Sequence, residues 1–308
     1  MKANQEIGWL LEGDPAIQFF VHKDLLHSGP EVLNALQARI ATEGWGAAFL
    51  ARRNPSGHWG RDFYQPKWTS THYTLLDLKN LGMPPAQPAC GESVRMYLRQ
   101  PEGAEGGINI FHSTPISDVC VNGMILNFAA WFTPGEKRLE SLADYLLDMQ
   151  MKDGGWNCAY FKGHTHSSVH STLSVLEGLL EFSKSGNPYR EKEIVEARKK
   201  GEAFLLLHRL FRSHRTGEVI DPKMLLLSYP GRWRYDVLRA LDYFRAAEAP
   251  FDPRMQDAIN VLLEKKGKDG RWPLQGKHPG QVHFDMERNG EPSRWNTVRA
   301  LRVLAYFS

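Results

Sequence analysis

The sequence has few cysteines, no long apolar run and no block of basic residues. Its 308 residues contain three cysteines, Cys90, Cys120 and Cys158, and this odd number argues against a disulfide scaffold and leaves free thiols or metal ligands. No apolar stretch reaches the roughly 18 residues that a membrane span needs. Basic and acidic residues are interspersed at a net charge of +3, so the clustered basic surface typical of nucleic-acid binding is also missing.

The overall composition is that of a globular protein. Apolar residues make up 42% and charged residues 24%, which excludes a disordered chain and a collagen-like one. The first 14 residues contain no apolar segment followed by a small-residue cleavage site. We therefore expect a cytoplasmic protein without a transmembrane segment, a monomer or homodimer, that binds a small-molecule or lipid-like substrate and no nucleic acid.

A short turn recurs along the chain and indicates a repeat architecture. Each copy places small residues before an aromatic or branched residue, and successive copies end 49, 48, 63 and 53 positions apart. The copies end at Trp59, Ile108, Trp156, Val219 and Trp272, and the copy at Val219 is the weakest. A segment with apolar residues three to four positions apart precedes each turn, and a more apolar helix is predicted after each loop.

The more apolar helices are predicted at 15–26, 68–81, 118–132, 168–182, 233–247 and 294–307. Strand signals are nearly absent. Six mostly buried helices alternating with five amphipathic ones predict an all-α fold, an α/α toroid close to (α/α)6, with the buried set inside. An open solenoid is the alternative, but it would expose one side of apolar inner helices. We expect one domain over 1–308, built from five to six helix-pair repeats.

Helix pairs punctuated by Gly-Gly-Trp turns resemble the prenyltransferase and squalene-cyclase repeat superfamily across essentially the whole chain. The Asp-x-Asp-Asp acid motif of squalene-hopene cyclases is absent, and so is the Asp-Asp-x-x-Asp motif of ionising terpene synthases. Cys90 begins Cys-Gly-Glu-Ser, which lacks the glutamine that the thioester proteins of this superfamily require. The metal-site motif is most similar to that of protein prenyltransferase β subunits.

That resemblance implies a zinc site. The β subunits bind Zn²⁺ through an Asp-x-Cys pair at the start of one inner helix and a histidine at the start of the next, which correspond here to Asp118, Cys120 and His170. His166 or His164 replaces His170 if the register is shifted. Residues two apart point to nearly opposite sides of a helix, so Asp118 must lie at the N-cap for the pair to converge. Three mixed ligands leave a fourth position open, as in catalytic zinc sites.

Two other interpretations of these residues stay open. Cys158, His164, His166 and His170 form a competing local set within one loop. Alternatively, Cys120 is a small buried apolar residue, Asp118 an ordinary N-cap and His170 a core histidine. The loop at 109–115 lacks the basic residues that grip a diphosphate in the prenyltransferases, which argues against protein prenylation.

The starts of the predicted inner helices supply the other candidate site residues. Their aligned peptide dipoles make this rim positive and favour an anionic group. His72 and Tyr235 are the candidates for proton transfer, and the candidates for substrate binding are Trp68, Tyr73, Arg232, Trp233, Arg294 and Trp295. Asp236 or Glu291 would pair with the arginines if these are structural, and the 283–285 segment either caps the cavity or secures its loop.

The leading hypothesis is a zinc-dependent enzyme, a transferase, hydrolase or lyase, that acts on a small, lipid-like, isoprenoid or anionic substrate in the central cavity. The zinc would activate a bound thiol, as in prenyl transfer, or a bound water. A metal-free terpene or isoprenoid cyclase with a cation-stabilising aromatic lining is the second hypothesis. A non-catalytic binding toroid is the third.

Overall fold

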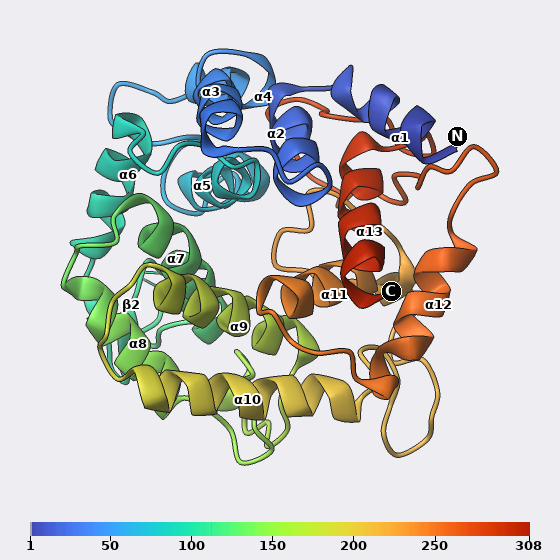
Figure 1. The fold of residues 1–308 in the computed structure, drawn as a ribbon. Helices are drawn as coiled ribbons and strands as arrows, with labels where there is room; N and C mark the ends of the chain where they lie inside the picture. Colours follow the sequence, from blue (N-terminus) through green and yellow to red (C-terminus); the bar gives the residue numbers. More distant parts are fainter. Residues whose placement is uncertain (1, 112) are drawn as a thin grey trace.

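The computed structural model describes residues 2–111 and 113–308, apart from the side chains of residues 2–4 (Figure 1). Nearly all of its regular structure is helical. The helices are α1 (Lys2–Leu11), α2 (Pro15–Asp24), α3 (Pro30–Ile40), α4 (Gly44–Leu50), α5 (Thr71–Asn80), α6 (Pro88–Leu98), α7 (Val119–Phe132), α8 (Arg138–Asp148), α9 (Val169–Lys184), α10 (Glu191–Leu207), α11 (Val237–Ala246), α12 (Gln256–Glu264) and α13 (Arg294–Phe307). A small hairpin joins β1 (Glu102–Gly103) to β2 (Gly106–Ile108).

The helices form two concentric layers that close into a ring, which confirms the predicted α/α toroid. Figure 1 shows α2, α5, α7, α9, α11 and α13 around the centre, with α1, α3, α6, α8, α10 and α12 outside them. The ring closes where α13 packs against α2, so the two ends of the chain complete one inner layer. No helix in the described part of the chain is long and apolar enough to cross a membrane.

The inner helices begin close to where the sequence predicts them. Asp118 caps α7 and Asp14 caps α2, each with its side chain accepting backbone N–H groups of the first turn. The exception is α11, predicted from residue 233 but observed from Val237. Asp236 is its cap and accepts the N–H of Arg239, so the preceding aromatic and basic residues lie in a turn outside the helix.

The repeated turns fix the outer layer to the inner one through the same two hydrogen bonds. The indole N–H of Trp59, Trp156 and Trp272 donates to an outer-layer carbonyl ten residues earlier, at 2.6 to 2.7 Å. The backbone N–H of each tryptophan donates to a threonine of the next inner helix, at 3.0 to 3.1 Å. These bonds fix the positions of α5, α9 and α13 along the ring axis relative to the outer layer.

The other two copies of the turn differ. At Ile108 the backbone N–H donates to Asn122 of α7 at 2.7 Å, so asparagine replaces threonine as the acceptor. At Val219 the chain instead pairs with Arg212 in an isolated β-bridge. This explains why the fourth copy is weak in the sequence, since its turn does not clamp an inner helix in the same way.

Two glycines bring the backbones of α7 and α9 into direct contact. A Cβ atom at Gly178 would overlap the carbonyl oxygen of Gly123, and one at Gly123 would lie 2.8 Å from the Cα of Val175. Glycine is therefore required at both positions for α7 and α9 to approach this closely. The contact places the start of α7 beside the loop that leads into α9.

Candidate metal centre at the start of two inner helices

Asp118 and Cys120 converge because Asp118 lies just outside the helix. Its backbone is extended, and its Oδ1 accepts the N–H groups of Cys120 at 3.0 Å and Val121 at 3.1 Å. The carboxylate thus folds back over the first turn, where the Cys120 thiol also lies. This is the cap geometry that the Asp-x-Cys spacing predicts.

Cys158 comes to the same place through the Trp156 turn. The N–H of Trp156 binds Thr172 and the N–H of Cys158 binds the hydroxyl of Ser171 at 3.2 Å, which holds this loop on the first turn of α9. Because α9 lies against α7, the Cys158 thiol reaches the start of α7. From the sequence, Cys158 was a possible metal ligand as a free cysteine and a member of the competing histidine-rich set, but it was not predicted to join Asp118 and Cys120.

Asp118, Cys120 and Cys158 form a compact donor group. A carboxylate oxygen and the two sulfur atoms all lie within 4.8 Å of one another, and all three residues are partly buried. The interaction between the two thiols and burial raise the pKa of Cys120, while the same interaction lowers the pKa of Cys158 to about 7 despite its burial. Two thiolates and one carboxylate suit zinc and leave a fourth position free, so the donor set fits the ion that the sequence predicts.

His170 is not the third member of this group. Its Nδ1 accepts the backbone N–H of Tyr235 at 2.8 Å, so a neutral imidazole carries its proton on Nε2 and has no lone pair there for a metal. Burial lowers the pKa of His170 to about 4, with Arg239 and Arg234 contributing, so the ring is neutral near pH 7. Cys158 occupies the position predicted for His170, and His164 and His166 are exposed loop residues outside the group.

The two candidates for proton transfer have other environments. His72 is completely buried among aromatic rings, and neither of its nitrogens has a partner among the described residues. Burial lowers its pKa to about 3. The Tyr235 hydroxyl donates to the carbonyl of Leu210, and burial raises its pKa. The described contacts of these two groups do not include the donor group, and their roles in proton transfer stay predictions.

A lysine lies near the donor group, and aromatic rings lie around this lysine. The Lys67 ammonium lies 5.0 Å from the ring centre of Trp68, 5.4 Å from that of Trp233 and 5.9 Å from that of Tyr64. Burial lowers the pKa of Lys67, while Cys120 and Asp118 favour its charged form. Lys67 precedes α5, away from the loop at 109–115, where the sequence analysis sought the basic residues. The signal in the sequence that could have identified Lys67 was its position directly before an inner helix and beside Trp68.

The remaining predicted substrate residues have other partners. Tyr73 is buried, and its hydroxyl lies 2.8 Å from that of Tyr64. Arg232 forms a buried ion pair with Asp77, and neither predicted partner, Asp236 nor Glu291, pairs with it or with Arg294. Arg294 reaches outward, where its guanidinium lies 4.5 Å from the ring centre of Trp9. Trp295 is buried against the rings of Phe20, Trp45 and Tyr229.

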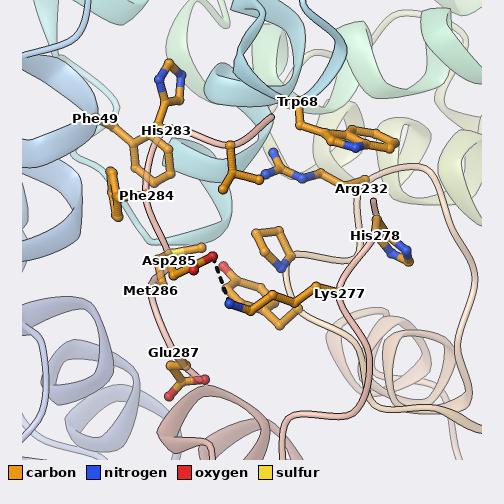
Figure 2. Close-up of a pocket in the computed structure, with 13 residues that line it drawn as sticks. Phe49, Trp68, Arg232, Lys277, His278, His283, Phe284, Asp285, Met286 and Glu287 are labelled. Carbon is orange, nitrogen blue, oxygen red and sulfur yellow. Dashed lines mark ion pairs between the residues drawn. The ribbon is translucent and has the colours of Figure 1, made fainter. Parts of the chain in front are cut away.

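The segment before α13 covers this end of the ring. His283 binds the Thr74 hydroxyl at 2.9 Å, and the Trp68 indole donates to Pro279 at 2.7 Å. Figure 2 shows Arg232 beside Trp68, with His283 and Phe284 across a small pocket and Lys277 paired with Asp285. The segment therefore both caps the pocket and is secured by it.

Comparisons with known proteins identify no family. No protein-family model matches the chain, and no curated protein matches it. A glycosyl hydrolase family 88 structure from Bacteroides vulgatus is similar over 95% of this chain and 89% of its own, with 14% identity and a TM-score of 0.46. A polysaccharide lyase structure scores 0.39 at 16% identity over 77% of this chain and 71% of its own. The type II terpene cyclase MstE from Scytonema scores 0.34 at 15% identity over 88% and 97%.

Proposed function

We propose that the protein is a zinc-dependent enzyme whose metal is held by Asp118, Cys120 and Cys158. The observation that carries the proposal is the convergence of two sulfur atoms and one carboxylate oxygen within 4.8 Å. Zinc bound there would supply a thiolate or hydroxide nucleophile at its open position. Asp118 holds its oxygen in place through two backbone N–H groups, which leaves its second oxygen for the ion.

The neighbouring residues favour a substrate with an anionic head and an apolar body. Lys67 supplies a positive charge beside the donor group, and its aromatic neighbours supply the surface for the apolar part. The indole N–H of Trp233 has no partner among the described residues and is available to a substrate oxygen. An isoprenoid diphosphate has this chemistry, and a thiol or water acceptor would displace its diphosphate.

The alternatives fit these observations less well. A metal-free cyclase would place an apolar polyene in the central cavity, but that cavity is lined by fourteen charged side chains. A non-catalytic toroid would give no function to the Lys67 ammonium or to the donor group near it. Oxidation of Cys120 and Cys158 to a disulfide in place of metal binding is a separate outcome that the experiment must detect.

Metal content tests the binding half of the proposal. We expect about one zinc per chain, measured by plasma mass spectrometry, in the unmodified protein and in His170→Ala. Asp118→Ala, Cys120→Ala and Cys158→Ala should each lose most of it. Cys90→Ala is the matched control, because Cys90 is a fully buried thiol outside the donor group. Absence of zinc in the unmodified protein, or mass evidence of a disulfide between Cys120 and Cys158, contradicts the proposal.

An open coordination position tests the catalytic half. In the cobalt-substituted protein, a small thiol should change the visible absorption, because it enters the fourth position. Release of diphosphate from geranyl diphosphate, with and without a thiol acceptor, should depend on cobalt or zinc and fall in Lys67→Met. If the thiol leaves the visible absorption unchanged and no diphosphate is released, the metal site is closed and structural, and the enzymatic assignment is overturned.

A further inference from the structure

The central cavity is a second polar chamber that the metal proposal does not use. It has a volume of about 510 Å³ and reaches from the C-terminal ends of the inner helices to the starts of α11 and α13. Eight basic and six acidic side chains line it, whereas Asp118, Cys120 and Cys158 do not. The excess of positive charge favours an anionic ligand, and the polar lining excludes a purely apolar one.

Most of these charges already have partners within the wall. Glu181 binds Lys79 at 2.8 Å, and Asp242 binds arginines of α11 and α13. The Arg239 guanidinium binds Glu177 and the carbonyl of Arg234. These groups stabilise the wall and have little capacity left for a ligand.

Arg232 and Asp236, which lie just before α11 and form what we call the cavity floor, are different. Arg232 also lines the small pocket of Figure 2. Arg232 uses Nη1 for its ion pair with Asp77, and its Nε and Nη2 donate no hydrogen bond to the described residues. The Asp236 carboxylate receives one N–H, from Arg239, on Oδ1. The two residues are 7% and 3% exposed, so donors and acceptors without partners lie deep in the chamber.

The backbone of Arg232 supports a function for this position. Its φ of +58° is in the left-handed region, which costs a non-glycine residue roughly 1 kcal/mol or more. Its guanidinium lies 5.6 Å from the ring centre of Trp68 and 5.8 Å from that of Tyr73, which fixes its plane. The strained backbone, the ion pair and the two rings together hold one edge of the guanidinium in place.

We propose that the floor of the central cavity binds a small hydroxylated organic carboxylate. The ligand carboxylate would accept two parallel hydrogen bonds from Nε and Nη2 of Arg232, and a ligand hydroxyl would donate to Asp236. Trp295 and Tyr229, which line the same chamber, supply faces for the carbon skeleton. This site does not depend on the metal proposal, because the two share no residue.

Three probes of similar length separate the two parts of this recognition. Gluconate carries a carboxylate and hydroxyls, sorbitol has only the hydroxyls, and hexanoate has only the carboxylate. We expect calorimetry to show saturable binding of one gluconate per chain, with sorbitol and hexanoate roughly tenfold weaker or worse. Equal binding of gluconate and hexanoate, or no gluconate binding, overturns the proposal.

Substitutions locate the site. Asp236→Asn keeps the helix cap but weakens acceptance of the ligand hydroxyl, and it should reduce gluconate affinity roughly tenfold. The double variant Arg232→Gln with Asp77→Asn replaces the ion pair by a neutral pair and should abolish binding. Asp236→Asn alone carries the test if the double variant does not fold. Affinity unchanged in Asp236→Asn contradicts the assignment.

Two controls are matched to this chamber. Tyr243→Phe should leave gluconate binding unchanged, because Tyr243 lines the same cavity but already donates its hydroxyl to Glu202 at 2.6 Å. Cys120→Ala should also leave it unchanged, which separates failure of this inference from failure of the metal proposal. Loss of gluconate binding in either control contradicts a separate site on the floor.

Discussion

The ring is held together in different ways on its two sides. Between α7 and α9 the contact is backbone against backbone at Gly123 and Gly178. Where α11, α13 and α2 meet, the contact is charged: Asp242 of α11 binds Arg245 of α11 and two arginines of α13, Arg299 and Arg302. Asp24 of α2 also pairs with Arg302 and Arg245. The α7–α9 pair therefore packs through close backbone approach, whereas the junction of α11 and α13 with α2, where the ring closes, uses charge pairing.

Removing the central carboxylate should have the largest effect on this comparison. Asp242 is 3.0 Å from Arg245, 3.2 Å from Arg299 and 2.9 Å from Arg302. Although burial opposes ionisation, these guanidinium groups hold the pKa of Asp242 well below its usual range. Asp242→Ala should lower the free energy of unfolding by about 3 to 5 kcal/mol in urea titrations, because it leaves buried cations without their shared partner.

The same carboxylate has a defined pH signature. Because its folded pKa is depressed, its contribution is present above the unfolded pKa of about 3.9 and is lost as the pH falls below that value. Asp242→Ala should therefore be less acid-sensitive than the unmodified protein below about pH 4. A variant as stable as the unmodified protein at pH 7 would show that the charged side of the ring contributes little.

Adding a methyl group at the α7–α9 contact should have the next largest effect on the free energy of unfolding. Gly178→Ala places a Cβ against the carbonyl oxygen of Gly123, and neither helix backbone can move without disturbing the other. We expect a loss of about 2 to 3 kcal/mol, measured as a shift in the urea midpoint. It should also move Asp118 and Cys120 relative to Cys158, because the start of α7 and the Cys158 loop depend on this contact.

Gly8→Ala is the matched control for that substitution. Gly8 lies within α1, and nothing lies within 4 Å of its added Cβ, so alanine should stabilise the helix by roughly 0.5 kcal/mol. Equal effects of the two alanines would mean that helix propensity, and not the α7–α9 approach, decides the result.

The α5–α7 contact sharpens the comparison, because it buries a titratable group that has no partner among the residues the structure describes. His72 of α5 lies against Phe128 of α7, with ring centres 5.6 Å apart, and burial lowers its pKa to about 3. Its stability contribution is complete above the unfolded pKa of about 6.5 and is lost as the pH falls. Between pH 7 and pH 5 the unmodified protein should lose about 2 kcal/mol more than His72→Phe.

Urea titrations of both proteins at the two pH values measure this difference. The other histidines are common to both proteins and cancel in the comparison. Parallel pH profiles for His72→Phe and the unmodified protein would place a hydrogen-bond partner on His72 and contradict its assignment as a neutral, unpartnered ring.

An ion pair on the outside of the ring should have the smallest effect. Arg95 of α6 binds Glu136 at 2.8 Å, with 51% and 37% of the side chains exposed. A double-mutant cycle with alanine at both positions should give a coupling of about 0.5 kcal/mol, reduced by salt. A coupling as large as the Asp242 effect would remove the distinction between interior and exterior charge.

Much of the fold could be predicted from the sequence because its signals are local. The period of the tryptophan turns reflects hydrogen bonds that recur in three repeats, and Asp14 and Asp118 cap α2 and α7 where their spacing to the apolar runs predicts. The start of α11 was wrong by four residues, because the apolar character of Trp233 extended the pattern beyond the true cap at Asp236.

Two of the three donors of the candidate site could be predicted from the sequence, but the third depends on contacts between helices. Asp118 and Cys120 are close in the chain, and one motif specifies both. Cys158 reaches them only through the Trp156 turn, the bond to Ser171 and the close approach of α7 and α9. His170 has a suitable position in the sequence, but its hydrogen bond from Tyr235 depends on where α11 begins.

Trp68 contacts both the cation near the donor group and the cation of the cavity floor. The Lys67 ammonium lies on it at 5.0 Å, the Arg232 guanidinium at 5.6 Å, and its indole N–H anchors the covering segment at Pro279. We therefore expect any replacement of this indole to perturb the surroundings of Lys67, those of Arg232 and the segment anchored at Pro279 together. To separate effects at the proposed metal site from effects at the cavity floor, Lys67 or Arg232 has to be changed while Trp68 is left intact.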